Sequence, residues 1–93
     1  MSRDERLLLQ ALQAANEEGK LEEFLKIILT HDERLDLAKR CRVLKELLRG
    51  AHSHREISTL FKVSVYKVSR GVHALREAKQ AKLNINHYLK EEE

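Results

Sequence analysis

The sequence contains no proline, no tryptophan, one cysteine and three glycines, and aromatic residues make up only 4% of its 93 residues. Without proline and with little glycine, it lacks the residues that most often interrupt helices, and 35% of its residues are charged. This composition is typical of a soluble all-α protein. A chain of this length forms at most one domain, and with so few aromatic side chains its core is expected to be thin. A second copy of the chain is therefore expected to complete the core.

Other absences exclude whole classes of protein. The single cysteine, Cys41, cannot form an internal disulfide, and its place in an apolar helical stripe predicts a buried free thiol. No apolar run approaches the roughly 18 residues of a membrane span, and no secretory signal is recognisable. We therefore expect a cytoplasmic protein that does not contact a membrane.

Catalytic and metal-binding patterns are also missing. The nearest histidine pair, His52 and His54, has no second pair or second cysteine to complete a tetrahedral metal site. There is no glycine-rich phosphate loop, and Cys41 among apolar neighbours is a poor nucleophile. We expect no enzyme, no metal and no covalently bound cofactor.

Hydrophobic periodicity and capping residues predict three helices in the first half of the chain. The first follows Ser2, buries one face and ends near Glu18, because Gly19 can adopt the left-handed conformation that stops a helix. The second covers residues 21–29. The third begins at a capping box, Thr30 to Glu33, and runs to Gly50. Its expected central packing surface is formed by Leu37, Cys41, Leu44 and Leu48.

Three further helices are predicted in the second half. Ser53 and Glu56 form a second capping box that begins a short helix through about residue 60. Ser64 begins another helix that ends near Arg76. A last helix is expected over about residues 79–90, and the acidic end, residues 91–93, is expected to fray.

Residues 53–76 have the pattern of a helix-turn-helix unit, two helices joined by a short turn. This segment contains five basic residues and one acidic residue, whereas residues 1–25 contain three basic and six acidic residues. Such a basic patch is typical of a polyanion site. Lys62 occupies the turn position that often carries glycine, at a cost of about 1 kcal/mol. The residues expected to lock the two helices together are Ile57, Phe61, Val63, Val68 and Val72.

In this geometry the second helix enters the major groove of DNA, and its outer side reads bases or contacts phosphates. The predicted DNA-binding residues are Ser53, His54, Arg55, Ser64, Val65, Tyr66, Lys67, Ser69, Arg70, His73 and Arg76. Two alternatives stay open on these residues alone. One is a basic solvated face on an ordinary helical hairpin. The other is a helical protein-interaction module whose basic face docks an acidic partner.

A longer stretch, LTHDERLDLAKRCRVLKELLRG followed by SHREI and VSRG, resembles the bacterial tryptophan (trp operon) repressor family. The similarity runs without a gap from about residue 27 to residue 76. Its most specific positions are Thr30, residues 32–34, Arg40, Arg42, residues 46–50, Ser53, Arg55, Glu56, Arg70 and Gly71. The resemblance implies an all-α, six-helix intertwined homodimer with a helix-turn-helix DNA-binding unit. In it, residues 1–93 form a single domain, residues 1–50 and 77–90 form the dimerisation core, and residues 53–76 form the helix-turn-helix.

The resemblance also implies a bacterial cytoplasmic repressor that binds a double-stranded DNA operator and takes L-tryptophan or a close analogue as corepressor. The ligand pocket would lie between the third helix and the recognition helix. The residues implied for it are Ile27, Leu29, Thr30, Arg40, Arg70, Gly71 and Ala74. Lys67 stands where the best-known members have threonine, and Ala74 stands where they have serine. A ligand-independent regulator of the same fold, with Lys67 in the pocket, therefore stays open as an alternative.

Overall fold

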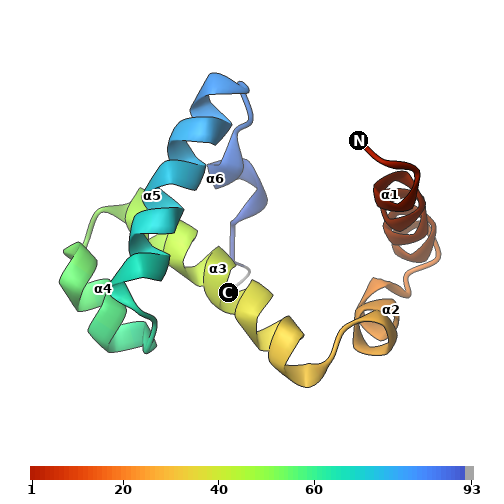
Figure 1. The fold of residues 1–93 in the computed structure, drawn as a ribbon, viewed down its shortest axis with the longest axis horizontal. Coiled ribbons are helices and arrows are strands. Elements are labelled where there is room, and N and C mark those ends of the chain that lie inside the picture. The colour runs from red at the N-terminus through yellow and green to blue at the C-terminus, as the bar shows by residue number, and fades with distance from the viewer. Residues whose placement is uncertain (92–93) are drawn as a thin grey trace. The chain divides into compact units, whose positions relative to one another are not determined.

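The structure, a computed structural model, describes residues 1–91 and is all-helical over that range (Figure 1). The helices are α1 (Arg3–Glu17), α2 (Leu21–Ile28), α3 (His31–Arg49), α4 (His54–Phe61), α5 (Val65–Gln80) and α6 (Ile85–Tyr88). The predicted all-α class is confirmed. None of the described helices has the length and apolar character needed to cross a membrane. The chain divides into two compact units, Met1–Leu35 and Asp36–Glu93, with the boundary inside α3.

Capping residues set the starts of most helices, as predicted. Ser2, Thr30 and Ser53 each accept a hydrogen bond from the backbone amide three positions later, at 3.1 Å. The glutamates at those positions return a bond to the capping amide and complete three capping boxes. These amide donors lower the pKa of each glutamate below its ordinary value. The chain thus satisfies its exposed helix N-termini with local side chains.

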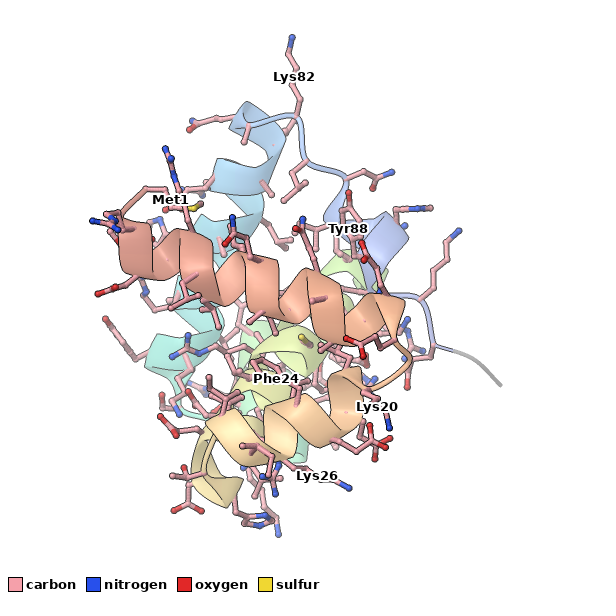
Figure 2. All side chains as sticks on the ribbon, turned by 90° about the vertical axis from the view of Figure 1, so that its right-hand side faces the viewer. Met1, Lys20, Phe24, Lys26, Lys82 and Tyr88 are labelled. Atoms are coloured by element: carbon pink, nitrogen blue, oxygen red, sulfur yellow. The ribbon has the colours of Figure 1, made fainter. Side chains whose placement is uncertain are left out.

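The first unit consists of α1 and α2 packed together and the first turn of α3. Leu12 and Ala15 of α1 are half-buried, as is Phe24 of α2, which lies on the α1 side of that helix in Figure 2. Leu8, four positions before Leu12 on α1, is exposed. Neither α1 nor α2 has a fully buried residue. The apolar surface of this unit is therefore poorly covered within one chain.

The second unit has a small core where α3, α4 and α5 meet. Its buried apolar residues are Val43, Ile57, Val63 and Val68. In Figure 1, α5 crosses α3 while α4 lies beside the first turns of α5. The crossing is close because Gly71 has no side chain: a Cβ there would lie 3.0 Å from the Val43 and Leu47 side chains. A larger residue at position 71 would require the Val43 and Leu47 side chains to shift.

The buried face of α3 differs from the predicted one. Cys41, predicted to be a buried thiol, is exposed, and so are Leu37 and Leu48. The buried positions are Val43 and Glu46. Cys41 and Val43 are two positions apart, so they point about 200° apart around the helix. Within one chain, α4 and α5 pack on the Val43 side and leave the predicted stripe open.

The connection between α4 and α5 is three residues long and tightly held. Lys62 adopts the left-handed conformation, with φ 53°, as predicted for this turn. The Ser58 hydroxyl donates to the Val63 carbonyl at 2.6 Å, and the Val63 amide donates to the Ser58 carbonyl at 3.1 Å. The side chain of Ser58 therefore fixes a turn that lacks glycine.

The C-terminal part differs from the prediction of one helix over residues 79–90. Helix α5 continues to Gln80, and α6 is only four residues long. Helix α5 is terminated by Lys82, which has φ 57° and projects outward in Figure 2. The Leu83 amide donates to the Ala78 carbonyl and the Lys82 amide to the Lys79 carbonyl, which together form a Schellman cap. The prediction was wrong because this cap normally carries glycine, and lysine gave no stop signal.

The segment after α6 is tied back to α3 by charged groups. Arg42 donates to both carboxylate oxygens of Glu91, at 2.8 and 2.9 Å, and Lys45 Nζ donates to the Leu89 carbonyl at 2.7 Å. Glu91 was predicted to fray, but its bonds to Arg42 hold it against α3. No sign of these bonds was visible in the sequence, because the two residues are 49 positions apart. Residues 92 and 93, the rest of that prediction, lie outside the described residues. The Arg42 guanidinium lowers the pKa of Glu91 to about 2.

The Arg42–Glu91 pair predicts a pH-dependent stability. Because the folded-state pKa lies below the ordinary 4.5, the pair stabilises the fold above about pH 5, and this contribution is lost as the pH falls toward 2. Glu91→Gln is therefore expected to lower the melting temperature at pH 7, with a difference from the unmodified protein that shrinks between pH 5 and pH 2.

Glu77→Gln is the matched control, because Glu77 is exposed and has no ion pair among residues 1–91. Thermal unfolding followed by circular dichroism measures both variants across this pH range. A Glu91→Gln effect that stays constant from pH 7 to pH 2 would contradict the assigned role of the pair.

Candidate nucleic-acid interface and ligand pocket

The helices α4 and α5 present the predicted DNA-binding residues to solvent. All eleven of these side chains are exposed, from Ser53 at the start of α4 to Arg76 in the fourth turn of α5. Val65 and Tyr66, at the start of α5, are 57% and 72% exposed. The predicted locking residues lie on the other side: Ile57, Val63 and Val68 are buried, while Phe61 and Val72 are half-buried. The helix pair therefore separates an apolar inner side from a polar outer side.

Both serines at the helix starts are already engaged in capping. The Ser53 and Ser64 hydroxyls accept from the Glu56 and Lys67 amides, each at 3.1 Å. Accepting these bonds leaves each hydroxyl proton available as a donor. A phosphate placed at either helix start would meet that proton and the positive end of the helix dipole.

Most of the cations on this surface are free of ion pairs. Arg55, Lys62, Arg70 and Arg76 make no salt bridge within residues 1–91. Lys67 is different, since its Nζ lies 3.0 Å from Asp36 Oδ1. Four unpaired positive charges on one pair of helices give the outer side the electrostatics that attract a polyanion.

A pocket of about 390 Å³ opens between α3 and α5, and all its lining residues belong to the second unit. Its apolar wall comes from Val43, Leu44, Val63, Gly71 and Ala74. Its charged and polar lining consists of Asp36, Lys39, Arg40, Tyr66, Lys67 and Arg70. This volume falls in the range of small-molecule sites, and the lining combines apolar walls with a few polar groups as such sites do.

Asp36 connects two of the pocket's cations. Its Oδ1 accepts from Lys67 Nζ at 3.0 Å, and its Oδ2 lies 3.1 Å from Arg40 Nη2. The hydrogen bond from Lys67 is the main cause of a lowered Asp36 pKa, with smaller contributions from the charges of Lys67 and Arg40. The carboxylate stays ionised and holds Lys67 on the pocket side of α5.

The predicted ligand-binding residues fall into two groups. Arg40, Arg70, Gly71 and Ala74 all line the pocket. The others are Ile27, Leu29 and Thr30, which belong to the first unit. The Leu29 carbonyl accepts from Arg34 Nη1 at 3.3 Å, and the Thr30 hydroxyl caps α3.

Sequence reasoning missed six pocket residues, which are Asp36, Lys39, Val43, Leu44, Val63 and Tyr66. Asp36 and Arg40 are four positions apart on a helix, a spacing that predicts a side-chain pair, so part of the Asp36 contact was visible in the sequence. The Asp36–Lys67 contact joins residues 31 positions apart and had no local signal. Over the range that the structure describes, no cluster of three potential metal ligands is found.

Comparison with known proteins decides the family. Residues 4–92 match the family described as Trp repressor protein. The chain belongs to the Trp repressor family. This is a family of DNA-binding transcriptional repressors, and its match covers α1 to α6.

Curated relatives agree with this assignment. A Trp operon repressor homolog of Photobacterium profundum is 39% identical over 69 residues, which cover 74% of this chain and 67% of the relative. Homologs of the same name from Vibrio parahaemolyticus and Xylella fastidiosa are 30% and 33% identical, each over 79 residues. These alignments cover 85% and 83% of this chain and 77% and 86% of the two relatives. The predicted resemblance to the Trp repressor family is thus confirmed.

Proposed function

We propose that this member of the Trp repressor family is a dimeric, sequence-specific repressor that binds a double-stranded DNA operator through α4 and α5. In this proposal α4 lies across the backbone and α5 enters the major groove, as in other helix-turn-helix units. A small amino acid, tryptophan or a close analogue, binds the pocket between α3 and α5 and raises DNA affinity. The observation that carries the proposal is the exposure of all eleven predicted contact residues on one helix pair. The same helix pair carries four cations that have no ion pair within residues 1–91.

The size of the single-chain core supports a dimer. Among residues 1–91, only Val43, Ile57, Val63 and Val68 are buried apolar residues, while large apolar side chains of both units are exposed. These exposed residues include Leu7, Leu8, Leu9, Ile27, Ile28, Leu35, Leu37 and Leu48. Large exposed apolar side chains in such number are typical of a protein interface, and a second copy of the chain is the commonest partner. A twofold dimer would also present two copies of α5 to neighbouring major grooves, about 34 Å apart.

The pocket supports a small ligand with a carboxylate. Arg40 and Arg70 both line it, and an arginine binds a carboxylate with two parallel hydrogen bonds. The apolar wall beside them, which includes Val43 and Leu44, suits an aromatic ring. Because the pocket lies between α3 and α5, a ligand there would favour one position of α5 over others, which is how binding can raise DNA affinity.

A second candidate function is a ligand-independent regulator of the same fold. The observation that favours it is the Asp36–Lys67 pair, which already joins α3 to α5 across the pocket. An exposed ion pair contributes little by itself, so this candidate depends on the geometry that the pair maintains more than on its strength. The substitution Lys67→Thr removes this cation, so that Asp36 keeps only its ion pair with Arg40.

The test is selection of DNA sites from a random pool, with and without L-tryptophan, at matched protein concentration. The proposal predicts an enriched palindromic site whose affinity rises when tryptophan is added, together with a dimer in analytical ultracentrifugation. Calorimetry with tryptophan checks binding to the protein alone.

The alternatives give different results. An enriched site with no tryptophan response, restored by Lys67→Thr, would favour the ligand-independent regulator. A well-folded monomer would contradict the dimer. Binding without any sequence preference would contradict the proposed repressor and favour a protein-interaction module.

A further inference from the structure

The first turn of α5 offers an unusual set of groups to DNA. This turn contains Val65, Tyr66 and Lys67, and it is the part of a recognition helix that contacts base edges in helix-turn-helix proteins. Two of the three side chains are apolar or aromatic and largely exposed. The third is a cation, and its contacts decide what the turn can read.

Lys67 is directed away from the outer side of α5. Its Nζ donates to Asp36 Oδ1 at 3.0 Å, and Asp36 is on α3. Both residues line the pocket, so the ammonium group lies on the pocket side of the helix. Arg40 holds the second oxygen of Asp36 and keeps the carboxylate in place. The only charge in the first turn of α5 is therefore neutralised by a partner on another helix.

The two side chains that remain offer little hydrogen bonding to base edges, a single hydroxyl on Tyr66. Guanine is read by arginine or lysine donors, adenine by asparagine or glutamine, and cytosine by carboxylate acceptors. Val65 supplies only methyl groups, and Tyr66 supplies an aromatic ring with one hydroxyl. Tyr66 also lines the pocket, while 72% of the residue is exposed. The one base-edge group in the major groove that an apolar surface recognises is the C5-methyl of thymine.

We propose that Val65 and Tyr66 read thymine C5-methyl groups at the centre of each half-site, and that Asp36 is the positioning residue that keeps Lys67 out of the groove. This inference rests on the proposed function, since it requires that α5 enters the major groove. It names the class of DNA sequence that the first turn selects: A·T pairs with thymine methyl groups facing α5. Guanine contacts are left to Arg55, at the start of α4.

Deoxyuridine isolates the methyl group, because it pairs like thymine and lacks only the C5-methyl. In the selected site, each thymine of a half-site is replaced in turn by deoxyuridine. At one or two of these positions the affinity is expected to fall about fourfold, the effect of losing burial of one methyl group. For the variants Val65→Ala and Tyr66→Ala, replacing the same thymines by deoxyuridine should lower the affinity less than it does for the unmodified protein.

Leu60→Ala is the matched control, because Leu60 is a comparably exposed apolar residue on α4. It should leave the deoxyuridine effect at full size. If no thymine in the site responds to deoxyuridine, or if Leu60→Ala removes the effect as well as Val65→Ala does, the inference is overturned.

Asp36→Asn tests the second part. It releases Lys67, which can then reach the groove or a phosphate. The variant is expected to tolerate guanine in place of the responsive thymines several-fold better, and to bind with a steeper salt dependence because additional phosphates are neutralised. Asp32→Asn, the same change on an exposed residue of α3, should alter neither property.

The failures of the two proposals can be told apart. If random selection yields no preferred sequence, the proposed repressor function fails and this inference fails with it. If a preferred site exists but contains no methyl-sensitive thymine, only the inference fails. If Asp36→Asn and Asp32→Asn shift specificity and salt dependence equally, the role of Asp36 is overturned.

Discussion

Replacing Ile57 by alanine is expected to lower the free energy of unfolding by about 2–5 kcal/mol. Ile57 is 0% exposed and packs with Val43, Val63 and Val68 where α3, α4 and α5 meet. Truncation removes buried apolar surface and leaves a cavity in a core too small to rearrange around it. A chain of this size has a total stability of about 5–10 kcal/mol, so the change takes a large share of it.

Urea unfolding followed by circular dichroism measures this loss, at one fixed protein concentration because a dimer's stability depends on concentration. Ile57→Val should cost about 0.5–1.5 kcal/mol. Leu60→Ala is the matched control, since Leu60 lies on the same helix and is 56% exposed. Equal losses for Ile57→Ala and Leu60→Ala would show that the core does not lie where α3, α4 and α5 meet.

Raising the salt concentration from 50 to 200 mM is expected to weaken operator binding by roughly four orders of magnitude. In residues 53–76, Arg55, Lys62, Arg70 and Arg76 have no ion pair among the described residues, so without ligand on Arg70 two copies would present about eight free cations to DNA. Each phosphate neutralised adds about 0.9 to the slope of log affinity against log salt, which gives a slope near −7. Fluorescence anisotropy with a labelled operator measures the slope.

Arg76→Ala should reduce this slope by roughly two for a dimer, because one phosphate contact is lost from each chain. Its effect should be similar for operator and for unrelated DNA, since a phosphate contact carries no sequence information. Glu77→Gln, next to it on α5, leaves the number of cations unchanged and should leave the slope nearly unchanged. A slope near zero in the unmodified protein would contradict the electrostatic reading of the surface.

The starts and stops of the helices could be predicted where the signal is local. Ser2, Thr30 and Ser53 were identified as helix starts, and each caps its helix. Gly19 and Gly50 were identified as stops, and both have positive φ. Lys82 ends α5 by the same geometry without glycine, so the prediction placed the helix boundary several residues too early. A helix cap that uses lysine in place of glycine cannot be recognised from the sequence.

In the candidate site, too, features with a local sequence signal could be predicted and contacts between distant residues could not. The basic character of residues 53–76 and the inner positions Ile57, Val63 and Val68 followed from composition and helical spacing. The partner of Lys67 did not follow from the sequence, because Asp36 is on another helix. The sequence left open whether this lysine turns to phosphate or fills the pocket. The fold gives a third arrangement, an ion pair across the pocket.

By itself the sequence determined the all-α class and the starts of α1 to α5, because capping bonds and hydrophobic spacing depend on residues within about four positions of each other. It also determined the membership of the Trp repressor family, through the match over residues 4–92. Only the tertiary structure decided which face of α3 is buried, that Arg42 binds Glu91, and that Asp36 holds Lys67. These contacts form only where two helices cross at a short distance. The crossing distance is set by packing between residues far apart in the chain, such as Gly71 against Val43.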